Sequence, residues 1–79
     1  MIVYVLTQQK HYDGTNILSA WSSIELAKAA ALALHLQNGG EPNTLQWEKV
    51  TISPRGPYTW ADIDANQSYV IIGMEVDAV

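Results

Sequence analysis

Cysteine is absent from this chain of 79 residues. Its absence excludes disulfide scaffolds, thiolate zinc sites and cysteine nucleophiles, and it fits a cytoplasmic protein. Charge is also scarce, because charged residues make up 15% of the sequence, against about 25% in typical domains. Disorder requires weak hydrophobicity and strong net charge, whereas 48% of these residues are hydrophobic. The sequence therefore predicts a single compact domain spanning residues 1–79.

Basic residues are few, and they are not clustered. Lys10, Lys28, Lys49 and Arg55 are spread along the chain, and the formal net charge is −4. Proteins that bind nucleic acid concentrate positive charge to neutralise phosphates. We therefore expect no nucleic acid among the partners.

Long hydrophobic runs are missing as well. The most apolar stretch after the first strand, residues 24–36, is interrupted by Glu25, Lys28 and His35. It is also too short to span a bilayer, which requires about 20 apolar residues. We expect no association with a membrane and a cytoplasmic location.

The residues that are present form several strand-like segments and one helix-like segment. Strands are predicted at residues 2–6, 17–21, 45–52, 58–63 and 68–76, and a helix is predicted from the serines at 22 and 23 to Gln37. The first two strands are joined by a polar loop that contains Asp13-Gly14. The prediction is an α+β fold: a small, mostly antiparallel sheet of about five strands with one helix, in the order β-β-α-β-β-β.

The helix carries the clearest local signals. Ser22 stands three residues before Glu25, a spacing typical of a capping box, and Asn38-Gly39-Gly40 is a stop signal. At about 100° per residue, Glu25, Lys28 and His35 fall on one arc. The residues opposite this arc, which are expected to pack on the sheet, are Leu26, Ala27, Ala30, Ala33 and Leu34. Leu32 and Leu36 border the charged arc, where they lie under a loop or extend a contact patch.

Four short segments resemble a family of small uncharacterised proteins from bacteriophages and actinobacteria. They are a leading "VYVL", a loop with "DG", a "WSS" before the helix and a closing "YVIIGMEVD". The family has no settled activity. The resemblance therefore implies a phage or bacterial origin and a location in the bacterial cytoplasm, and it assigns no function to any residue.

Candidate chemical residues are sparse. His11 and Asp13, with His35 and Glu41 elsewhere, are the only set that resembles metal ligands. Structural metal sites usually show two closely spaced ligand pairs, so loop roles are expected for His11 and Asp13. Ser22 is explained by its capping position. We expect no catalytic residue, no metal and no cofactor.

Apolar residues occupy both faces of the first and last strands, whereas one helix can cover only one face. The second face is covered either by the long loops or by a partner, which is a second copy in a homodimer or another protein. Tyrosine and tryptophan suit such an interface. The candidate interaction surface consists of Tyr4, Tyr58, Trp60 and Tyr69, with Leu32 and Leu36 from the helix.

The function expected from these observations is a non-enzymatic binding module, encoded by a phage, that binds a host or phage protein. Inhibition of a bacterial defence system is one form that this function would take. The alternative is a protein that sequesters a small molecule, such as a nucleotide signal, at a dimer seam. A third hypothesis is a small enzyme that uses His11, Asp13 or His35.

Overall fold

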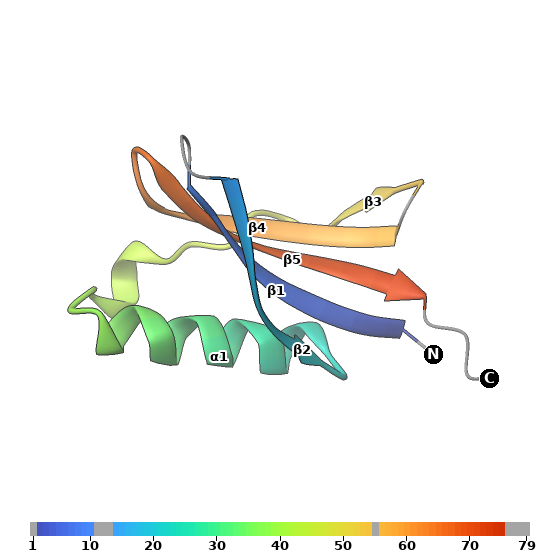
Figure 1. Ribbon diagram of the computed structural model, residues 1–79, viewed down its shortest axis with the longest axis horizontal. Coiled ribbons are helices and arrows are strands. Elements are labelled where there is room, and N and C mark those ends of the chain that lie inside the picture. Colours follow the sequence, from blue (N-terminus) through green and yellow to red (C-terminus); the bar gives the residue numbers. More distant parts are fainter. Residues whose placement is uncertain (1, 11–13, 55, 76–79) are drawn as a thin grey trace.

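The computed structural model describes residues 2–10, 14–54 and 56–75. One antiparallel sheet has the strand order β2-β1-β5-β4-β3, and the helix covers only one of its faces (Figure 1). The elements are β1 (Ile2–Lys10), β2 (Gly14–Trp21), α1 (Ile24–Gln37), the 3-10 turn η1 (Pro42–Thr44), β3 (Thr51–Ser53), β4 (Gly56–Asp64) and β5 (Gln67–Glu75). The predicted α+β class is confirmed. Within the described ranges, no helix is long and apolar enough to cross a membrane.

The strand predicted at residues 45–52 is wrong for most of its length, because only Thr51–Ser53 pairs as a strand. The preceding segment lies against β4 and is attached to it mainly at Glu48. The backbone N–H of Glu48 donates to the Trp60 carbonyl at 2.8 Å, and its carbonyl accepts from the Thr59 hydroxyl at 2.5 Å. A side-chain hydroxyl thus takes the place of a backbone donor, and no regular ladder forms between these segments.

The helix begins one residue later than the predicted cap requires. Ser23 is the N-cap, in an extended conformation with φ −148° and ψ 159°, and its hydroxyl accepts from the Leu26 N–H at 3.2 Å. The proposed cap at Ser22 is therefore wrong, although the predicted last residue, Gln37, is confirmed. Gly39 follows the helix with φ +86°, a left-handed conformation that closes helices and favours glycine.

Replacing the observed cap should weaken the helix. We expect Ser23→Ala to lower the free energy of unfolding by about 1 kcal/mol, because one N–H of the first turn loses its acceptor. Ser22→Ala is the matched control and should leave the stability unchanged within error. Urea unfolding of the two variants measures the difference. Equal losses for both serines would contradict the assignment of Ser23 as the cap.

The face that the helix turns toward the sheet also differs from the predicted one. Its buried residues are Ala27, Ala31 and His35, whereas Leu26 is exposed. The small alanines let the helix approach the sheet closely. Lys28 is half-buried, with its ammonium 5.9 Å from the centre of the Trp47 ring, a cation–π distance. Two members of the predicted charged arc therefore lie on the packed side, and the predicted arc is wrong.

The core lies between α1 and the face of the sheet that it covers. It consists of Leu6, Ala27, Ala31, Leu45, Ala61, Tyr69 and Ile71. The strand members of this set lie in register, since Leu6 pairs with Ile71 and Ala61 pairs with Tyr69. Because side chains alternate along a strand, the neighbours of these residues point to the opposite side of the sheet.

Candidate functional site: the open face of the sheet

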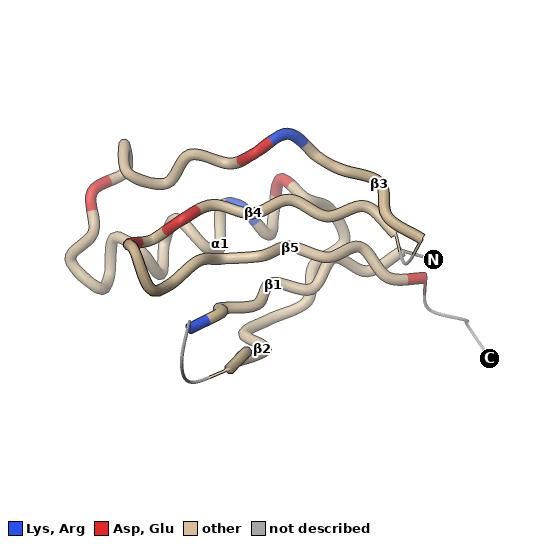
Figure 2. The backbone as a smooth tube through the Cα atoms, turned by 90° about the horizontal axis from the view of Figure 1, so that it is seen from above, with Lys and Arg blue, Asp and Glu red and all other residues tan. Residues whose placement is uncertain are grey.

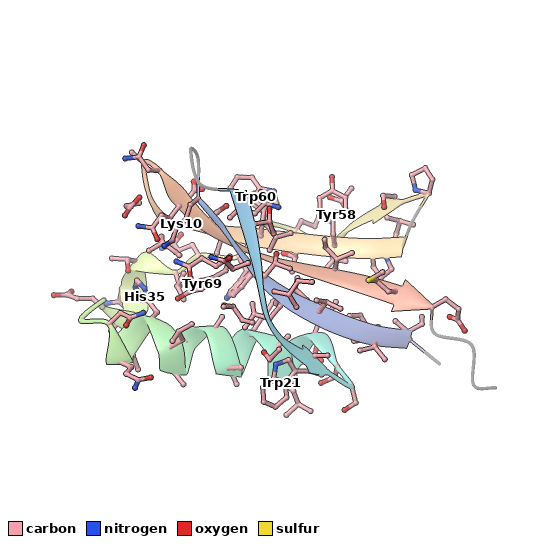
Figure 3. The ribbon with its side chains drawn as sticks, in the orientation of Figure 1. Lys10, Trp21, His35, Tyr58, Trp60 and Tyr69 are labelled. Carbon is pink, nitrogen blue, oxygen red and sulfur yellow. The ribbon has the colours of Figure 1, made fainter. Side chains whose placement is uncertain are left out.

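The face of the sheet that points away from α1 is apolar at its centre. Its central side chains, which we call the open face, are Val3, Val5, Tyr58, Trp60, Val70, Ile72 and Met74. They form rows across three strands, because Ile72 of β5 pairs with both Val5 and Tyr58, and Val70 pairs with Trp60. Figure 3 shows Tyr58 and Trp60 on the side of the sheet opposite the helix.

The open face is only partly sheltered from solvent. Trp60 is 37% exposed and Met74 is 49% exposed, while Tyr58, Val70 and Ile72 are half-buried. A shallow depression of about 430 Å³ lies over this region. It is lined by Gln9, Ser53, Tyr58, Trp60, Ser68, Val70 and Ile72. The long loops that could have covered this face leave a tryptophan side chain accessible.

The centre of this face is uncharged, and one acidic residue lies at its margin. In Figure 2 the central parts of β1, β4 and β5 carry no charged position. Among the described strand residues on this side, Asp62 is charged, and it lies near the end of β4 opposite Ser68. An uncharged centre with an acidic residue at its margin can bury apolar surface without desolvating an ion. The arrangement suits contact with another protein.

The predicted interaction residues divide between the two faces. Tyr58 and Trp60 lie on the open face, as the proposed surface requires. Tyr69 is 1% exposed beneath α1 and belongs to the core, and Tyr4 is half-buried on the same side, against Gly73. Including these two tyrosines in the surface was wrong, since their strand positions turn them toward the helix.

The two helix leucines do not extend the open face either. Leu32 packs against the core, and Leu36 is 46% exposed on α1, on the other side of the sheet. The surface instead gains Val70, Ile72 and Met74, which were not among the candidate site residues. Alternation along the last strand is the signal that identifies them, because it separates them from Tyr69 and Ile71.

Burial of Tyr69 gives the protein a predictable response to alkaline pH. Desolvation raises the pKa of the Tyr69 phenol above its usual value of 10.0. Above that pH the unfolded chain loses the proton first, so the unfolded state binds fewer protons and stability falls as pH rises. We expect Tyr69→Phe to show a smaller decline. Urea unfolding below and above this pH tests the expectation, and parallel declines in both proteins would contradict it.

His35 has a structural set of partners. Its ring is 5% exposed, and Nε2 lies 2.6 Å from the Thr44 hydroxyl and 3.0 Å from the Glu41 carbonyl. Because the Thr44 hydroxyl donates to that same carbonyl at 2.7 Å, the Nε2–H of His35 donates. The ring also fills the space beside Gly40, where an added Cβ would overlap it. His35 thereby ties the end of α1 to η1.

The other members of the hypothetical catalytic set, His11 and Asp13, lie outside the described residues. Within the described part of the chain, no three His, Asp or Glu side chains gather in a way that could hold a metal ion. We expect thermal unfolding curves with and without a chelator to coincide, since a closed zinc site requires four ligands. A loss of stability on adding the chelator would overturn this prediction and bring His11 and Asp13 back as ligands.

The fold and the site together define a class of protein by geometry: an α+β domain with a helix on one face of an antiparallel sheet and an accessible apolar surface on the other. Comparisons with protein-family models, curated proteins and solved structures found no match. The case for a function therefore rests on the residues of the open face.

Proposed function

We propose that this protein is a non-enzymatic binding module that contacts another protein through the open face. The observation that carries the proposal is the accessible side chain of Trp60, which is 37% exposed and stands beside Tyr58, Val70 and Ile72 over an uncharged depression. Tryptophan and tyrosine supply most of the binding energy at many interfaces, because they bury a large area with few rotatable bonds.

The chemistry of the open face indicates the character of the partner. An apolar centre favours a partner that presents an apolar surface of its own, with polar groups confined to the rim. A host or phage protein in the bacterial cytoplasm is the partner that agrees with the family resemblance. Inhibition of a bacterial defence system is a specific form of the same proposal.

A nucleotide signal is a poorer match for this depression. Phosphates are usually held by arginine, lysine or several converging N–H groups. The polar side chains lining the depression are Gln9, Ser53, Tyr58, Trp60 and Ser68, and none of them is basic. The described residues thus favour a protein partner over the small-molecule alternative.

Resistance of binding to salt tests the proposal. The immobilised protein is exposed to bacterial lysate, and the proteins that it retains are washed with increasing sodium chloride. We expect a specific partner to remain bound at high salt, because apolar contacts are not screened by ions. Release of every retained protein between low and physiological salt would contradict an apolar interface.

A further inference from the structure

A second pocket lies on the helix side of the sheet, at the end of the molecule where α1 stops. It has a volume of about 520 Å³ and is bounded by the residues that follow α1, by η1 and by the adjoining ends of β4 and β5. None of its lining residues belongs to the depression on the open face. The protein therefore has a separate concave site of the size that small ligands occupy.

Tyr69 brings an unpaired hydroxyl to this pocket. Its side chain is 1% exposed, and the hydroxyl makes no hydrogen bond to the described part of the chain, where every fully buried polar side-chain atom has a partner. The hydroxyl is therefore the part of Tyr69 that reaches the pocket. Figure 3 shows Tyr69 between the sheet and α1, toward the end of the helix that carries His35. Because buried tyrosine hydroxyls usually have a hydrogen-bond partner, this one is free to bind a ligand.

The groups beside this hydroxyl are mainly hydrogen-bond acceptors. His35 also lines the pocket, and its Nε2–H donates to η1 and the residue before it. Its Nδ1 is then an acceptor, and it has no partner in the described chain. The pocket also adjoins the C-terminal end of α1, where the helix dipole is negative. A site of this kind selects a ligand that donates hydrogen bonds and carries positive charge.

Two carboxylates add negative charge to the pocket. Glu41 and Asp64 are its charged lining residues, and no lysine or arginine occurs among the described residues that line it; Lys10 lines a neighbouring depression that shares Asp64. The Asp64 carboxylate is held in place, because it accepts from the Asn66 N–H at 2.7 Å and from the Gln67 side-chain amide at 3.2 Å. Since a carboxylate can accept about four hydrogen bonds, Asp64 keeps lone pairs for a ligand.

We propose that this pocket binds a small organic cation of the aliphatic diamine class. A primary ammonium group has three N–H donors and no acceptor, which matches the Tyr69 hydroxyl, His35 Nδ1 and the Asp64 carboxylate. Two carboxylates in one pocket suit two ammonium groups, whereas a phosphate or carboxylate ligand would meet charge of its own sign. The pocket and the open face lie on opposite sides of the sheet, so this inference is independent of the proposed function.

Three molecules with the same four-carbon chain test the class of ligand. They are 1,4-diaminobutane, neutral 1,4-butanediol and anionic succinate, each titrated into the protein and followed by NMR of the backbone amides. We expect the diamine to shift the amides of residues 38–41 and 63–67 in a saturable way and to leave Trp60 unchanged. The diol and succinate should shift neither group. Absence of a shift with the diamine at high millimolar concentration, or equal shifts with the diol, would overturn the proposal.

Matched variants test the residues. Asp64→Asn should weaken diaminobutane binding about tenfold, because a charge-assisted hydrogen bond is lost. It should stay folded, since the Asn oxygen can still accept from the Asn66 N–H. Asp62→Asn removes the same charge from the same strand but outside the pocket, and it should bind like the native protein. Equal losses for the two variants would show general charge attraction and contradict the site.

Tyr69→Phe tests the hydroxyl alone. This variant should bind the diamine about fivefold more weakly, the effect of one hydrogen bond. Its free energy of unfolding at neutral pH should not fall, because the hydroxyl has no hydrogen bond to the described chain that the substitution could remove. Native affinity in a folded Tyr69→Phe protein would contradict the assignment of Tyr69 as a ligand-binding residue.

Discussion

Gly56→Ala should destabilise the protein by about 3 kcal/mol, the largest effect that we expect from a single methyl group. Gly56 begins β4 with φ +132°, a backbone conformation that residues with a Cβ rarely adopt. An added Cβ would also overlap the carbonyl oxygen of Gly73 on β5. Because the obstacle is backbone in a central strand, it can move only by distorting the β4–β5 ladder.

Gly39→Ala provides the control for backbone conformation alone. Gly39 also has a positive φ, +86°, but an added Cβ there meets open space. We expect this variant to lose about 1 kcal/mol, the cost of a left-handed conformation without a steric clash. Equilibrium urea unfolding of both variants measures the difference. Equal losses would show that the contact between Gly56 and Gly73 contributes nothing.

The sheet could largely be predicted from the sequence because its strands are rich in β-branched, aromatic and other apolar residues. This composition identified the strands around Leu6, Trp60 and Ile71, and the apolar residues on both faces of the first and last strands showed that a single helix would leave one face uncovered. The strand ends were less predictable. Pairing with β1 extends β2 back to Gly14 through the polar Thr15 and Asn16, where composition alone had indicated a loop.

The orientation of the helix could not be predicted, because α1 is apolar around most of its circumference. In the sequence IELAKAAALALHLQ, alanine and leucine occur on every side, so periodicity does not distinguish one face from another. Lys28 and His35 were therefore predicted on the solvent side of the helix because they are polar. His35 is instead buried by partners in η1, and Lys28 lies over Trp47. Both sets of partners come after the end of the helix in the sequence, so the periodicity of the helix does not reveal them.

The candidate site was predicted in part. Two residues on one strand, Tyr58 and Trp60, share a face by alternation, and the structure places both on the open side. Whether Tyr4 and Tyr69 share a face with Tyr58 depends on the register between the strands. The sequence alone does not give that register. Ala61, and not Tyr58, is the β4 residue opposite Tyr69, and this register turns Tyr69 toward the helix.

Trp60→Ser should abolish most of the binding while the protein stays folded. Truncating an aromatic anchor at an interface typically costs about 2 kcal/mol or more, which corresponds to a dissociation constant raised about 30-fold. Because Trp60 is 37% exposed and lies outside the core, the variant should keep its circular dichroism spectrum and cooperative unfolding. Tyr58→Ala, on the same face, should also weaken binding.

Ile52→Ser is the control for loss of exposed apolar surface, because Ile52 is 76% exposed and lies outside the open face. The partner is purified from the lysate capture. The decisive measurement is its dissociation constant from the native protein, Trp60→Ser and Ile52→Ser, determined by titration calorimetry. If the open face is the binding surface, Trp60→Ser binds the partner at least about 30-fold more weakly than the native protein does, and Ile52→Ser binds it with native affinity. A folded Trp60→Ser variant that binds its partner with native affinity would contradict it.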